Sequence, residues 1–180
     1  LSSQQQLSLI TSNLGEKIDN ISNYAITLSI NSNIADVLKE NPTVPENTLE
    51  HFLVNSELTD QAQRIIGLHK NIYAWDILDT ENHWFHSSTT ETDQLDSILG
   101  PEVLDSLQTN LAFQFLGPFQ ISGEPTFVAL KSITNIDNTK YLGALVLLIR
   151  ETNISSAFRD LPDSSSRDFY ITDENGQILS

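Results

Sequence analysis

The chain has 180 residues and a net charge of −15 at pH 7, and it contains neither cysteine nor methionine. Its length suits one domain, or one and a fraction. The missing cysteines exclude disulfides, thiolate catalysis and cysteine-ligated zinc, and the acidic balance argues against nucleic acid as a partner. No apolar run reaches the roughly 18 residues of a membrane span. Because no methionine is present, we expect an excised piece of a longer protein, whose membrane segments flank it.

The first 41 residues carry a seven-residue apolar repeat, Leu7, Leu14, Ile21 and Leu28. This spacing predicts one amphipathic helix, which Asn41-Pro42 ends because proline disfavours helix in the residue before it. At 1.5 Å per residue such a helix would be roughly 57 Å long. We expect it to run past the core, to pair with a second chain or to span two stacked modules. The alternative is an ordinary core helix with frayed ends.

Next the sequence predicts a second helix, a β-hairpin and a third helix. Apolar residues predict the second helix, and they are Leu49, Phe52, Leu53, Ala62, Ile65 and Ile66. The hairpin has strands at 72–78 and 84–86, around a polar turn at 79–82. Helical spacing returns over 93–111 and is interrupted near Gly100-Pro101.

Three further strands are predicted at 113–120, 126–133 and 141–149. The last is apolar at every position after Tyr141 except Gly143, as expected for a strand covered on both faces. A short helix or turn over 153–161 and a polar linker follow. The chain then closes on FYITDENGQILS (169–180), which has the pattern of a hairpin. Antiparallel strands with covering helices indicate an α+β fold.

Catalytic motifs are missing from the chain, so we predict no catalytic residues and no cofactor. There is no glycine-rich phosphate loop, no G-x-S-x-G and no H-E-x-x-H. His83 and His86 are three apart, which places them on opposite sides of a strand, so we predict no metal site. Asp76, Asp79 and Glu81 are interpreted as turn and surface residues.

A candidate ligand site lies at the predicted hairpin. Trp75 and Asp76 occupy its first strand, with Trp84 and His86 opposite. Lys131 interrupts an apolar strand face, and a charged group there needs a partner, which would be Asp76 or a ligand carboxylate. Aromatic side chains with a few polar groups are typical of small-molecule pockets. The alternative places both tryptophans in the core and Lys131 on an exposed edge.

Several stretches resemble a Cache domain, the extracellular PAS-like sensor of bacterial signalling proteins. They are SNIADVLKENP (32–42), NIYAWDILDTENHWFHSS (71–88), FLGPF (115–119) and YLGALVLLIRETNISSAF (141–158). The resemblance implies a PAS-like antiparallel sheet flanked by helices. It implies a signalling helix over 1–41 and a membrane-distal module over 42–161. Residues 162–180 would be a linker and the start of a truncated second module, or the closing hairpin of the first.

The resemblance also implies a function. The chain would be the extracytoplasmic sensing domain of a transmembrane two-component sensor histidine kinase, without catalysis of its own. It would bind a small-molecule or cell-envelope ligand and pair as a homodimer. The same module could serve a chemoreceptor or a nucleotide cyclase. From other classes, an adhesion or scaffold domain and a hydrolase with an unrecognised site stay open.

One part of the Cache pattern is absent. The amino-acid-binding subgroup has a Tyr/Arg/Trp/Asp set that holds the backbone of its ligand. Here Arg64, Tyr73, Trp75 and Asp76 are present but not at that spacing. Amino-acid sensing is therefore not supported, and no binding residue is transferred from the family.

Overall fold

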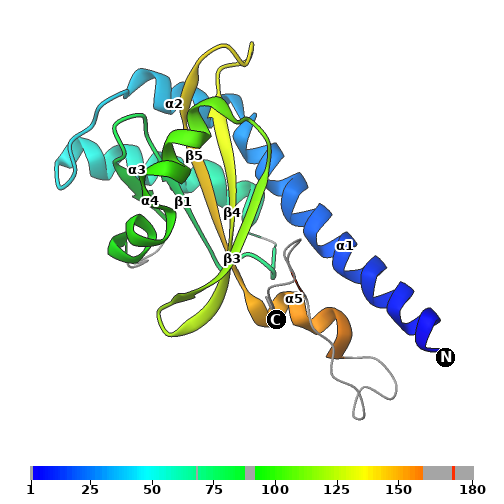
Figure 1. Ribbon diagram of the computed structural model, residues 1–180. Helices are drawn as coiled ribbons and strands as arrows, with labels where there is room; N and C mark the ends of the chain where they lie inside the picture. Colours follow the sequence, from blue (N-terminus) through cyan, green and yellow to red (C-terminus); the bar gives the residue numbers. More distant parts are fainter. Residues whose placement is uncertain (1, 68, 88–91, 160–171, 173–180) are drawn as a thin grey trace.

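A computed structural model describes residues 2–67, 69–87, 92–159 and 172 (Figure 1). The elements are α1 (Ser3–Ser29), α2 (Ser32–Glu40), α3 (Leu49–Ile66), β1 (Ala74–Leu78), β2 (Trp84–His86), α4 (Thr92–Thr109), β3 (Gln114–Ile121), β4 (Glu124–Thr134), β5 (Tyr141–Arg150) and α5 (Glu151–Arg159). The strands form one antiparallel sheet in the order β2-β1-β5-β4-β3. This confirms the predicted α+β fold, with a long N-terminal helix.

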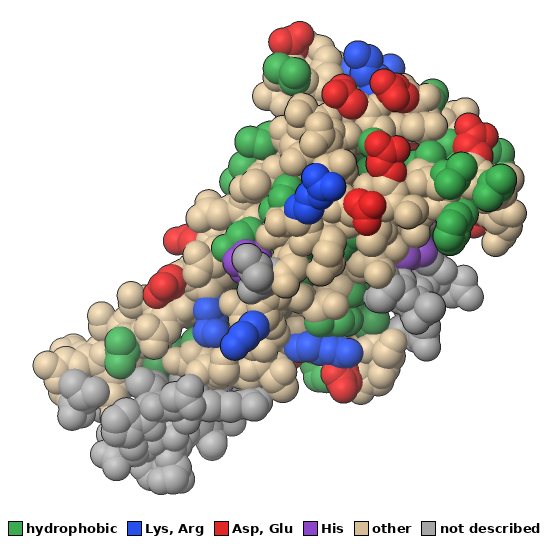
Figure 2. All heavy atoms as spheres, turned by 180° about the vertical axis from the view of Figure 1, so that it is seen from behind, with side chains coloured by type: hydrophobic (Ala, Val, Ile, Leu, Met, Phe, Trp, Pro, Cys, Tyr) green, Lys and Arg blue, Asp and Glu red, His purple; other side chains and the backbone are tan. Residues whose placement is uncertain are grey.

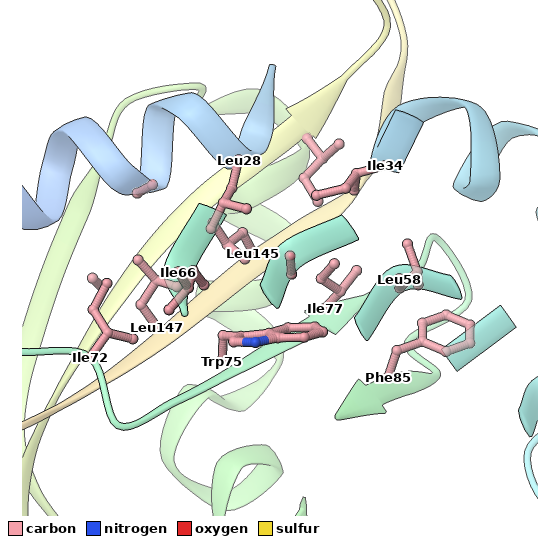
Figure 3. Packing of buried hydrophobic residues seen from close by; sticks show 14 of the residues in the cluster. Leu28, Ile34, Leu58, Ile66, Ile72, Trp75, Ile77, Phe85, Leu145 and Leu147 are labelled. Atoms are coloured by element: carbon pink, nitrogen blue, oxygen red, sulfur yellow. The ribbon is translucent and has the colours of Figure 1, made fainter. Parts of the chain in front are cut away.

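The sheet is covered on both faces. On one face α1, α2, α3 and α5 contribute to a core that includes Trp75, Ile77 and Leu145, and Figure 3 shows helix residues such as Leu28 pointing onto the strands. On the other face α4 packs over residues such as Val146. Side chains alternate between the two faces along each strand. The central strand β5 is buried from Leu142 to Ile149, as predicted for a strand covered twice.

The predicted single helix over 1–41 is wrong in one respect, because the chain breaks it into α1 and α2 around Ile30. Asn31 has an extended backbone, and its side-chain oxygen accepts a hydrogen bond from the Ile34 backbone N–H at 3.1 Å. This is an N-cap, which starts a new helix. The apolar period continues across the break, so the periodicity alone did not reveal it. The predicted end at Asn41-Pro42 is confirmed.

The seven-residue stripe of α1 divides into two parts. Ile21 and Leu28 are buried in the core, whereas Leu14 is partly buried and Leu7 is 59% exposed. Accordingly the C-terminal half of α1 packs on β4 and β5, and the rest continues past the sheet on the side of α5 (Figure 1). The helix is therefore longer than the sheet it covers, as expected from the sequence.

The second predicted helix exists as α3, but its apolar face was assigned wrongly at its start. The buried stripe is Val54, Leu58, Ala62 and Ile66, which recur every four residues. Leu49, Phe52 and Leu53, which were expected in the core, are exposed. The first turns of α3 carry apolar residues on both sides, so periodicity did not select the buried one.

The remaining predicted elements agree with the structure within a few residues. The hairpin is β1 and β2, and the interrupted helix is α4, where Gly100 has a non-helical backbone with φ of 61°. The three later strands are β3, β4 and β5. The closing hairpin expected at 169–180 lies outside the described residues, apart from Thr172.

Candidate functional site

The hairpin brings three of the five predicted site residues to one face. Asp76 pairs with His86 and Leu78 pairs with Trp84 in the β1–β2 register. Because alternate residues share a face, Asp76, Trp84 and His86 all lie on the face that α4 covers. The Trp84 indole Nε1 donates a 2.7 Å hydrogen bond to Asp96 Oδ1 of α4. The structure therefore brings these three predicted residues together on one face of the hairpin.

Asp76 and His86 form the most buried polar contact of the hairpin. Asp76 Oδ1 lies 2.7 Å from His86 Nδ1, and the Asp76 side chain is fully buried. Its second oxygen, Oδ2, has no hydrogen-bond partner among the described residues. Burial raises the pKa of Asp76, and the hydrogen bond and charge of His86 lower it to a smaller extent. Burial of the Asp76 carboxylate is therefore unfavourable, and one of its two oxygens accepts no hydrogen bond from the described residues.

Three side chains outside the hairpin cover the free edge of β2. Glu46 Oε1 lies 3.4 Å from the Trp84 backbone N–H, and Asn55 Oδ1 accepts from the His86 N–H at 2.8 Å. His51 Nε2 lies 3.0 Å from the Trp84 carbonyl oxygen. An edge strand exposes unpaired backbone groups, and here side chains from α3 and the loop before it satisfy them instead of another strand.

These groups surround a cleft of about 490 Å³ between α3 and the edge of β2. We call it the hairpin cleft, and its lining residues are Glu46, Asn47, Thr48, His51, Phe52, Asn55, Trp84 and His86. Its volume is in the range of small-molecule sites. The sequence pattern pointed to Trp84 and His86 but not to the lining residues of α3 and the loop before it. Those residues contact β2 across 31 to 38 residues of sequence, and such contacts leave no local pattern.

Trp75 and Lys131 do not belong to this group. Trp75 is buried in the core under α3 and lines a separate cavity of about 230 Å³. Lys131 pairs with Leu145, whose side chain faces α1, so Lys131 lies on the opposite face from Asp76. Its Nζ donates a hydrogen bond to the Leu111 carbonyl, and partial burial lowers its pKa. The predicted pairing of Lys131 with Asp76 is therefore wrong.

The two histidines of the hairpin have separate partners. His83 Nδ1 lies 3.0 Å from Asp79 Oδ2, whereas His86 contacts Asp76. Asp79 Oδ1 also accepts from the backbone N–H of Glu81 and of His83, which is the turn role expected for it. The expected surface position is wrong for Asp76 and Asp79, because both side chains are buried. Within the described ranges no three His, Asp or Glu side chains are placed to hold a metal ion.

The described helices include none that is both long and apolar enough to cross a membrane. No family model matches the chain, and no curated protein matches it. Solved structures do. The ligand-binding domain of the Campylobacter jejuni chemoreceptor Tlp3, in complex with L-norvaline, superposes with a TM-score of 0.68 at 13% identity. The match covers 98% of this chain and 66% of that one.

Two further structures come from Vibrio cholerae. The LuxQ periplasmic domain has a TM-score of 0.60 at 12% identity, over 88% of this chain and 69% of that one. The sensor domain of the histidine kinase DctB has a TM-score of 0.58 at 14% identity, over 87% of this chain and 58% of that one. The chain thus spans less than two thirds of the Tlp3 and DctB chains. The fold is that of periplasmic sensory domains, as the Cache resemblance predicted.

Proposed function

We propose that this chain is the extracytoplasmic sensing domain of a membrane-anchored bacterial receptor, and that a ligand binds in the hairpin cleft. The supporting observation is the cleft itself, about 490 Å³ in a fold shared over 98% of the chain with a ligand-binding domain. The cleft accommodates a metabolite or one side chain of a larger cell-envelope ligand. Catalysis and a cofactor are not part of this proposal.

A thermal-shift screen tests ligand binding. The wild-type chain, Trp84→Ala and Lys131→Ala are heated with a library of metabolites and cell-wall fragments. We expect at least one compound to raise the melting temperature of the wild type and of Lys131→Ala, but not of Trp84→Ala, because bound ligand stabilises the folded state. If no compound raises the melting temperature of the wild type, or if Trp84→Ala responds equally, ligand binding in the cleft is excluded.

For the complete protein we propose a sensor histidine kinase, as the DctB likeness supports. We also propose that two of its subunits pair. The likeness to Tlp3 supports a chemoreceptor as the second candidate. Incubation of the full-length protein in vesicles with labelled ATP separates them, since only the kinase acquires an acid-labile phosphohistidine. Failure to label, with coupling to a chemotaxis kinase instead, would select the chemoreceptor.

We propose α1 as the element that transmits the bound state. It packs on the sheet at Ile21 and Leu28 and continues beyond it, so a small shift of the sheet moves the N-terminal end of the helix. A ligand shifts the position of α1 only if it binds more tightly to one of two conformations of the domain than to the other. One residue inserted at Gly15 would rotate the end by about 100°, since a helix has 3.6 residues per turn. We expect altered output of the full-length receptor, and unchanged output would contradict this role.

A further inference from the structure

The outward face of α3 carries an apolar patch that no other described element covers. Leu49, Phe52 and Leu53 are 75%, 66% and 58% exposed. Their spacing of three and four residues places them on one side of the helix, opposite the buried Val54 and Leu58. Single exposed apolar residues are ordinary, but adjacent ones mark interaction surfaces. We call these three residues the α3 ridge.

Acidic groups surround the α3 ridge. Glu46 and Glu50 lie at its beginning, and Glu57 and Asp60 follow on the exposed side of the helix. The nearest basic residue of α3 is Arg64, roughly 16 Å along the axis from Leu53, the near end of the ridge. Figure 2 shows hydrophobic and acidic side chains together at the right-hand edge, the end of the molecule where α3 begins. The ridge therefore suits a partner that is both apolar and basic.

The hairpin cleft adjoins the ridge, because Phe52 belongs to both. A carbonyl only accepts hydrogen bonds, so His51 Nε2 donates to the Trp84 carbonyl, and Nδ1 of the neutral ring is an acceptor. His86 Nδ1 donates to the Asp76 carboxylate. The carboxylate of Glu46 adds further acceptors, and none of the described lining residues is Lys or Arg. Such a cleft favours a ligand group that carries several N–H donors and a positive charge.

We propose that the α3 ridge and the hairpin cleft together dock a basic amphipathic peptide. One lysine or arginine side chain enters the cleft beside Glu46, and apolar side chains of the same peptide pack on Phe52 and its neighbours. This inference rests on the proposed function and names its ligand class. It also distinguishes the site from one for a free amino acid, whose carboxylate requires a cation that the described lining residues do not supply.

A second copy of this chain is the less suitable occupant. Each copy has a net charge of −15, and a symmetric contact through the ridge would bring Glu46, Glu50 and Glu57 of both copies together. Like charges that face each other across an interface oppose association. A basic peptide would instead be attracted to these acidic groups, and its binding should weaken as added salt screens the charges.

The test measures fluorescence anisotropy of three labelled amphipathic peptides: one of Lys and Leu, one with Glu in place of every Lys, and a scrambled Lys–Leu sequence. We expect only the first to bind the wild-type chain tightly. Glu46→Gln and Phe52→Ser should each weaken the binding of this peptide about tenfold, because the first removes a charge-assisted hydrogen bond and the second removes a buried apolar contact. Glu16→Gln and Ile136→Ser, an acid and an apolar residue exposed elsewhere, are matched controls and should not change it.

Several outcomes overturn the proposal. Equal binding of the Glu–Leu peptide would mean that charge is not recognised, and unchanged binding by Glu46→Gln and Phe52→Ser would place the peptide elsewhere. Sedimentation that shows a dimer lost in Phe52→Ser would assign the ridge to a second copy. If the peptide fails but a compound from the thermal-shift screen binds in a Trp84-dependent manner, the peptide inference fails and the sensor function stands. If neither binds, both fail.

Discussion

The Gly143 α-carbon lies directly against the backbone of Leu78, on the neighbouring strand β1. A Cβ atom placed on Gly143 would be 2.4 Å from the Leu78 carbonyl oxygen. The two strands pair over five positions beside this contact, so neither backbone moves away freely. The glycine therefore allows β1 and β5 to approach, and with them the hairpin that carries the site.

This contact predicts opposite effects for two glycine substitutions. Gly143→Ala should lower the free energy of unfolding by about 2 kcal/mol, since backbone shifts in a packed core cost about this much. Gly15→Ala, in a half-buried turn of α1 with no atom within 4 Å of the added Cβ, should raise it by up to about 1 kcal/mol. Urea unfolding measures both. A neutral Gly143→Ala variant would contradict the close approach.

Asp76→Asn should remove part of the pH dependence of stability. The raised pKa of Asp76 means that its contribution is complete below its ordinary value of 3.8 and is lost as pH rises through the folded-state value. The wild type should lose stability over that interval relative to Asp76→Asn, as measured by urea unfolding at a series of pH values. Asp137→Asn, an exposed loop residue, is the control. Parallel curves for wild type and Asp76→Asn would disprove the effect.

Tyr141 should ionise at unusually high pH. Burial, and to a smaller extent the charge of Asp79, raises its pKa from 10.0 to about 12. The stability that this group contributes is present below pH 10 and is lost as pH rises through about 12. Tyrosinate absorbance should show a late step that Tyr141→Phe lacks. Asp79→Asn should move this step only slightly downward, because burial is the larger cause; a full return to 10.0 would show that the charge dominates.

Lys131→Met should leave binding at the hairpin cleft unchanged, although the sequence placed Lys131 in the site. Its side chain lies on the opposite face of the sheet and contacts the Leu111 carbonyl. We expect a stability change within about 1 kcal/mol, since its apolar stem already packs along the surface. Titration with the Lys–Leu peptide measures the affinity, and a tenfold loss of affinity in Lys131→Met would show that Lys131 contributes to binding.

Local patterns in the sequence determined most of the fold. Two apolar runs around a polar turn predicted the hairpin, with Trp84 and His86 opposite Trp75 and Asp76, and Gly100-Pro101 marked the interruption of α4. The apolar run after Tyr141 predicted the doubly covered strand β5. These features depend on residues close together in the chain, whose periodicity reports local structure directly.

Only the tertiary structure decided which surfaces meet. Periodicity places Lys131 on one face of a strand but does not say which face meets α1, and it assigned the α3 ridge to the core. The cleft depends on contacts that Glu46, His51 and Asn55 make across 31 to 38 residues with the edge of β2. Such contacts follow from how the helices pack on the sheet. The position of a residue in its own helix or strand determines the direction of its side chain, but it does not determine which other element that side chain meets.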